Sequence, residues 1–216
     1  MPSEWEMMMR SLALLIALAL PAVADAHEVW VERDGNGPAR IYLGEPAEAL
    51  PPGGDPEFKR LQAPKIVGQP TAPLVRRMGF IEAKVAPGDV RVVDNSVFEP
   101  WGDAGAKEGV VYYARAGRGT TATKMAYEIA PLTANGTRFA LLHDGKPVPA
   151  AKVTLITPAR KSVELVAAAD GSITVPAESK GRYLLTAAQV ETGKLSVAAG
   201  PVDKLHHIAT TTFMVK

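Results

Sequence analysis

The sequence contains no cysteine among its 216 residues. This absence excludes disulfide bonds, thiolate metal ligands and cysteine nucleophiles together. Neither positive nor negative residues are in excess, because the sequence has 24 lysines and arginines and 23 aspartates and glutamates. A chain so close to neutral lacks the basic footprint that nucleic acid or an anionic membrane surface requires. We therefore expect no nucleic acid among its partners.

Long apolar runs are also missing, apart from Leu12–Leu20, which Pro21 ends. This run is much shorter than the ~20 residues of a membrane-spanning helix. It precedes Ala24-Asp25-Ala26, an A-x-A cleavage pattern, so residues 1–26 are predicted to be a signal peptide. The mature chain is then periplasmic, does not span the membrane and begins at His27. Because two acidic residues precede the run, which is unusual in a signal peptide, translation has four candidate start sites: Met1, Met7, Met8 and Met9.

The rest of the chain is punctuated by turn-forming sequences such as GNGP, APGD, HDGKP and ADGS. Between them lie short runs rich in Val, Ile, Thr and Tyr, a rhythm typical of a β-sandwich. One helix start is visible at Asp55-Pro56-Glu57, where an N-cap residue is followed by proline and an acid. That helix is predicted to be short and to end before Pro64. The sequence thus predicts a mainly β protein.

Two parts of the mature chain differ in regularity. Residues 126–216 contain about seven strand-like segments, with the spacing of an immunoglobulin-like or transthyretin-like β-sandwich. Residues 27–125 form a less regular, β-rich N-terminal half. We therefore divide the chain into a signal peptide (1–26), an N-terminal β-rich region (27–125) and an immunoglobulin-like β-sandwich (126–216).

Motifs for catalysis or for organic cofactors are missing. The sequence has no G-x-S-x-G, no H-E-x-x-H and no phosphate-binding loop. The segment Gly117–Ala122 fits the dinucleotide pattern G-x-G-x-x-A, but β-branched residues and Pro131 follow where a crossover helix is needed. We interpret this segment as a loop. We therefore expect no organic cofactor.

Four histidines remain as candidate metal ligands: His27, His143, His206 and His207. Cleavage after Ala26 would give His27 a free α-amino group, whose ordinary pKa of about 7.7–8.0 lets it lose its proton readily. The amine and Nδ1 of one residue can chelate a single ion. Glu28 or Glu32 would supply an oxygen, and another imidazole would complete the set. Nitrogen donors without sulfur favour Cu(II), followed by Ni(II) and Co(II).

Each histidine also has a plainer interpretation. Alternation along the last strand places His207 on the face of the phenylalanine that follows and His206 on the opposite face, so only one of them can point to a given site. His143 lies at the entrance of an Asp-Gly turn, where a solvated histidine is ordinary. His27 is alternatively a free terminus without a ligand. Trp30 lies on the opposite face from its two valine neighbours and is expected in the core.

Seven segments of the sequence resemble one family. They are AHEVWVE, GVVYYARAG, YEIAPL, LLHDGKPVPAAKVTLIT, DGSITVP, GRYLLTAA and ATTTFMV. In them the chain resembles a bacterial periplasmic family often described as nickel- or cobalt-uptake accessory proteins (the nickel uptake substrate-specific group). Its members share an Ala-His junction, an L-x-D-G-K-P hairpin, here Leu142–Pro147, and a Thr-rich closing strand, here Thr210–Val215. The resemblance implies a periplasmic, non-enzymatic β-sandwich protein that handles transition metals, with a binding role carried over to His27.

Three functions follow from these observations. The first is a periplasmic protein that binds nickel, cobalt or copper through His27 and assists metal uptake, with a metal permease or another envelope protein as partner. The second is a structural or interaction module of the cell envelope that uses sheet edges and the loop around Trp101. The third is a copper-dependent oxidase or monooxygenase with the same histidine chelate. Aromatic residues amount to only 6%, which gives the third function no obvious flat substrate face.

Overall fold

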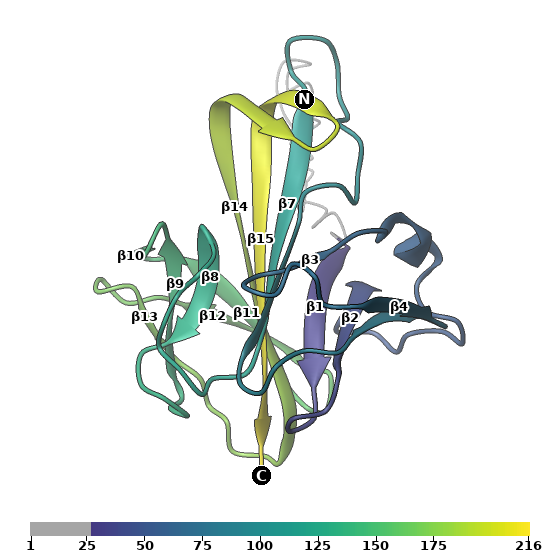
Figure 1. Cartoon of the computed structure of the whole chain (residues 1–216). Coiled ribbons are helices and arrows are strands. Elements are labelled where there is room, and N and C mark those ends of the chain that lie inside the picture. The colour runs from purple at the N-terminus through teal and green to yellow at the C-terminus, as the bar shows by residue number, and fades with distance from the viewer. Residues whose placement is uncertain (1–26) are drawn as a thin grey trace, which may run out of the picture.

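A computed structural model describes residues 27–216 (Figure 1). Residues 1–26, with the predicted signal peptide and its start sites, lie outside the described residues. The described chain contains fifteen β-strands and one short 3-10 helix, so the prediction of a mainly β protein is confirmed. Within residues 27–216, no helix is long and apolar enough to cross a bilayer.

The strands form three sheets. The first has the order β1-β2-β5-β4, with the bounds Glu28–Arg33, Ala39–Gly44, Phe80–Ala83 and Leu74–Arg77. In the second, β9 pairs with β8, β10 and β13, and the bounds are Arg138–His143, Tyr127–Pro131, Lys146–Pro147 and Ser172–Thr174. The third has the order β12-β11-β14-β15-β7-β6-β3, with the bounds Ser162–Val166, Lys152–Ile156, Gly181–Val197, Gly200–Val215, Glu108–Ala116, Val90–Asp94 and Lys65–Ile66.

The seven-stranded sheet lies between the other two (Figure 1). Its centre is the long hairpin β14–β15. The second strand of this hairpin pairs in parallel with β7, from Lys204 opposite Glu108 to Thr212 opposite Ala116. Strands from both sides of residue 125 therefore share this sheet.

Three consecutive threonines of β15 join the central sheet to both of its neighbours. Because successive side chains of a strand point to opposite faces, Thr210 and Thr212 face β1, whereas Thr211 faces β8. The Thr210 hydroxyl donates to the Val29 carbonyl at 2.8 Å, and Thr212 bonds to β1 in the same way. The Thr211 hydroxyl donates to the Ile129 carbonyl at 2.6 Å. Buried polar side chains thus fix the stacking of the sheets.

The central sheet separates two apolar cores. One of its faces packs against β8, β9 and β13, and the other packs against β1, β2 and β5. Trp30 belongs to a third, smaller apolar core. It is 4% exposed and packs with Ile156 and Leu184, on the opposite face of β1 from Val29 and Val31. The prediction for this tryptophan is confirmed.

The one helix of the described residues, η1 (Pro56–Arg60), is a single 3-10 turn. The Asp55 side chain accepts a hydrogen bond from the Glu57 N–H at 2.7 Å. The predicted N-cap and the predicted end before Pro64 are therefore confirmed. The segment Gly117–Ala122 contains no helix, as expected for a loop.

Candidate functional site

His27, the first described residue, places its imidazole between two carboxylates. Its Nε2 lies 3.1 Å from Asp55 Oδ1, and its Nδ1 lies 3.7 Å from Glu45 Oε1. The first distance is that of a hydrogen bond, whereas the second is too long for one. The side chain is 29% exposed, so the ring is held in place and is still reached by solvent.

Two local structures bring these carboxylates to His27. β1 and β2 are antiparallel with Glu28 opposite Gly44, so Glu45, which follows β2, comes beside the residue that precedes β1. Asp55 approaches as the N-cap of η1. Glycine at position 44 permits this approach, since a Cβ there would lie 3.0 Å from the Asp55 Cβ, and the backbone has a φ of +150°. The arrangement depends on the hairpin and on the cap together.

Asp55 determines which nitrogen of His27 is available to a ligand. Its Oδ1 already accepts the Glu57 N–H, so the carboxylate is fixed in position. A carboxylate accepts hydrogen bonds but does not donate them, and therefore Nε2 carries the proton. Nδ1 faces the side of Glu45. A carboxylate that orients an imidazole in this way is the usual companion of a metal-binding histidine.

Glu28 lies in the adjacent interior of the molecule. Its Oε1 accepts a hydrogen bond from the Thr186 hydroxyl at 2.8 Å, while its Oε2 is closed to solvent and has no hydrogen-bond partner within residues 27–216. Burial raises the pKa of Glu28 to about 8; the Thr186 hydrogen bond opposes this rise and the charge of Glu45 adds to it. This carboxyl group is therefore mostly protonated at neutral pH.

The other three histidines lie elsewhere. His207 and His143 are neighbours, with ring centroids 5.8 Å apart, and His207 bonds through Nδ1 to the Tyr113 hydroxyl (3.2 Å) and through Nε2 to Glu191 (3.1 Å). Burial lowers the pKa of His207. These contacts lie on the face of the central sheet that packs against β8 and β9.

His206 lies on the opposite face of β15, as alternation predicts. Its Nε2 is 2.6 Å from Glu108 Oε2, and its ring stacks on Trp101 with the centroids 5.6 Å apart. Within the described residues, none of these three imidazoles forms a hydrogen bond, ion pair or ring contact with His27 or Asp55. The structure therefore does not bring a second imidazole to His27.

The oxygen ligands expected from the sequence are also placed differently. Glu32 lies near the other end of β1, where it pairs with Arg40 (3.7 Å) and Arg182 (3.4 Å). Sequence reasoning missed Glu45 and identified Asp55 only as a helix cap. The usable signal was the antiparallel pairing of the first two strands, which sets the residue after the second strand beside the residue before the first.

Side chains alone do not form a complete metal site in the part of the chain that the structure describes. No group of three or more His, Asp or Glu residues within 27–216 is arranged to hold a metal ion. A site at His27 therefore needs a further donor, and the α-amine released by cleavage is the nearest one in the chain.

Comparison with known proteins gives no further guide. No protein-family model, curated protein or solved structure matches this chain.

Proposed function

We propose that this protein binds a transition-metal ion at His27 after removal of the predicted signal peptide. Cleavage after Ala26 frees the α-amine, which adds a nitrogen donor beside Nδ1 of the same residue. The observation that carries the proposal is the position of the imidazole between Asp55 and Glu45. One carboxylate orients the ring, and the other supplies an oxygen ligand.

The distances fit such an ion. Bonds from a metal to imidazole nitrogen or carboxylate oxygen are ~2.0–2.2 Å long. One ion bound to both His27 Nδ1 and Glu45 Oε1 would therefore span the 3.7 Å between them. The Nε2–Asp55 contact matches the outer carboxylate that accompanies metal-binding histidines. A nitrogen-rich set without sulfur favours Cu(II), then Ni(II) and Co(II).

The role that we propose is metal uptake or delivery in the periplasm. Such a role needs a few donors that exchange an ion and no catalytic residue, and a metal permease is the fitting class of partner. We also propose that residues 126–216 form an immunoglobulin-like or transthyretin-like sandwich. The apolar core between β8, β9, β13 and the central sheet supports this assignment.

Native intact mass of the mature protein, after exposure to Cu, Ni and Co together, tests the site. We expect a chain that begins at His27 and carries one metal ion. Adding one alanine before His27 should remove the ion, because the amine would become an amide. Asp55→Asn should weaken binding about 10–100-fold, the usual effect of losing an outer carboxylate.

The matched control for this test is Glu48→Gln, which neutralises an exposed carboxylate on the same segment as Glu45. It should leave metal binding unchanged, whereas Glu45→Gln should weaken it. An apo mass with all three metals, or a metal that survives the added alanine, would contradict the proposal.

A second candidate is an interaction module of the cell envelope. Trp101 is 41% exposed and is held against His206 by stacking. Exposed aromatic side chains of fixed orientation are frequent in the centres of protein interfaces. This candidate has no metal function, and it predicts that Trp101→Ala impairs the role of the protein in the cell envelope while replacement of all four histidines leaves the phenotype unchanged.

A further inference from the structure

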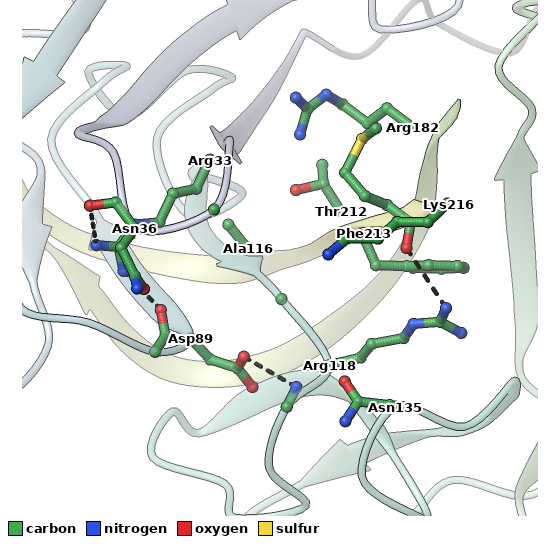
Figure 2. A pocket seen from close by; sticks show the side chains of 15 residues that line it. Arg33, Asn36, Asp89, Ala116, Arg118, Asn135, Arg182, Thr212, Phe213 and Lys216 are labelled. Atoms are coloured by element: carbon green, nitrogen blue, oxygen red, sulfur yellow. Dashed lines mark hydrogen bonds between the residues drawn. The ribbon is translucent and has the colours of Figure 1, made fainter. Parts of the chain in front are cut away.

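A second feature of interest lies at the opposite end of β1 from His27. There, the ends of β1, β7 and β15 surround a cavity of about 500 Å³ (Figure 2). This volume lies within the range of small-molecule sites, ~300–1,000 Å³. Four basic residues line the cavity: Arg33, Arg118, Arg182 and Lys216. Among the described residues, Asp89 is the only acidic side chain in the lining.

Two ion-pair networks account for part of this charge. Arg182 and Arg40 bind Asp34, at 2.5 and 2.6 Å, and also lie near Glu32, so two positive and two negative groups balance there. The second network is built around Arg115, which binds two carboxylates and leaves neither free. Its members are Arg91, Arg115, Asp89 and Glu128. Neither network contributes net charge to the cavity.

Arg33 and Arg118 are not balanced in this way. Among residues 27–216, no carboxylate forms an ion pair with either guanidinium. Arg33 is 8% exposed and donates all of its N–H groups to backbone carbonyls, those of Asn36, Gly37, Val85, Ala86 and Gly88. Burial lowers the pKa of both arginines, which reflects the unfavourable desolvation of an uncompensated cation. Two fixed positive charges thus face one cavity.

Arg118 has hydrogen-bond donors that are not used within the described chain. Its guanidinium lies over the Phe213 ring at 4.6 Å, and it donates to the carbonyls of Gly136 (2.9 Å) and Met214 (3.4 Å). An arginine has five N–H donors in a planar fork. Three of those of Arg118 therefore find no partner in the described chain. Figure 2 shows Arg118 on one side of the cavity and Arg33 on the other.

We propose that this cavity binds a small anionic molecule through its carboxylate or phosphate group, with Arg118 as the direct donor and Arg33 as a buried source of positive potential. The planar fork of arginine matches the oxygens of either group. Stacking on the Phe213 ring holds the Arg118 guanidinium in a fixed orientation. The site is independent of His27 and stands whether or not a metal binds there.

The test is an NMR titration of the mature protein with inorganic phosphate and, separately, with succinate, at constant ionic strength. We expect saturable shifts of the Gly117 and Gly119 amides and of the Arg118 Nε–H signal. Arg118→Met should weaken binding at least ~10-fold, because charge-assisted hydrogen bonds are lost. Arg118→Lys, which retains the charge but not the fork, should give a smaller loss.

The matched control is Arg160→Met, the same change of charge at an exposed arginine outside this cavity. It should leave the affinity unaltered. The anion that binds with the higher affinity identifies the preferred group, phosphate or carboxylate. The proposal is overturned if neither anion gives saturable shifts, or if Arg118→Met and Arg160→Met bind alike. If Arg118→Met does not fold, the unaltered protein provides the test. An Arg118 Nε–H signal that does not shift when either anion is added would then overturn the proposal.

Discussion

Glu128 and Glu28 lie on opposite faces of the central sheet, and both have carboxylate oxygens closed to solvent. Glu128 accepts hydrogen bonds from Arg91 Nε and Arg115 Nη1, each at 2.7 Å, and from two backbone N–H groups. Glu28 accepts one, from Thr186, and its second oxygen has no partner in the described chain. The same side chain is thus fully satisfied in one place and poorly satisfied in the other.

This difference in hydrogen bonding indicates that Glu128 has a structural role, whereas Glu28 is destabilising where it lies, beside the proposed metal site. A buried charge with complete hydrogen bonding is held firmly, and removal of one partner is strongly destabilising. Glu128 also organises the loop at Gly117–Ala122, since Arg115 bonds to backbone oxygens at both Gly117 and Thr120. Glu28 has no cationic partner among the described residues and keeps a proton instead, next to the proposed metal ligands. Departures from complete satisfaction are concentrated at functional sites.

The largest effect is expected when the well-satisfied carboxylate is neutralised. Glu128→Gln leaves two buried guanidiniums with one carboxylate fewer, so we expect a loss of about 3–5 kcal/mol in the free energy of unfolding. Urea denaturation measures this. Glu164→Gln breaks an exposed pair with Lys152 and should change stability by less than about 1 kcal/mol. Similar values for the two variants would show that the Glu128 network is not structural.

A smaller, pH-dependent effect is expected at the other carboxylate. Because the pKa of Glu28 is raised to about 8 in the folded protein, the folded state keeps a proton that the unfolded chain releases above its ordinary pKa. Stability contributed by this group is therefore present at low pH and is lost as the pH rises. The expected loss is about 3 kcal/mol between pH 5 and pH 7, at ~1.4 kcal/mol for each unit.

Glu28→Gln should flatten this dependence. The measurement is the free energy of unfolding at several pH values in the presence of a chelator, with Glu48→Gln as the control because that side chain is exposed. A parallel fall in stability for the unaltered protein and for Glu28→Gln would show that this carboxyl group is already ionised in the fold.

The smallest effect is expected at the hydroxyl that serves Glu28. Thr186→Val keeps the shape of the side chain and removes the hydrogen bond, so we expect a loss of about 1–2 kcal/mol near pH 5. The fall in stability should also continue to higher pH, since this bond lowers the pKa of Glu28 and its loss raises that pKa further. Calorimetric unfolding checks both values. The exposed Thr174→Val should have no effect, and an equal loss there would remove the special role of Thr186.

What the sequence could predict was decided by local patterns. The N-cap at Asp55, the burial of Trp30 and the opposite directions of His206 and His207 each follow from residues a few positions apart. Glu45 was missed because its place beside His27 comes from strand pairing. This contact joins segments that are distant in sequence, and no short pattern encodes it.

The cavity lined by Arg33 and Arg118 could not be predicted from the sequence for the same reason. Arg33 ends β1 of the first sheet, whereas Arg118 lies in the loop after β7 of the central sheet. They line one cavity because β15 pairs with β7 and also packs against β1. The composition does not indicate this cavity either, since a net charge near zero is compatible with a local excess of positive charge. Partial ion pairing, and not the number of arginines, produces that excess.

The position of β15 has a consequence for the order of folding in time. It comes last in sequence among the described strands, and yet it forms the middle of the central sheet, between β14 and β7. Both apolar cores use it, so neither is complete until residues 200–215 are present. Pairing between residues about 100 positions apart is slow to form. We therefore expect the pairing of β15 with β7 to be the slow step of folding, because it completes both cores.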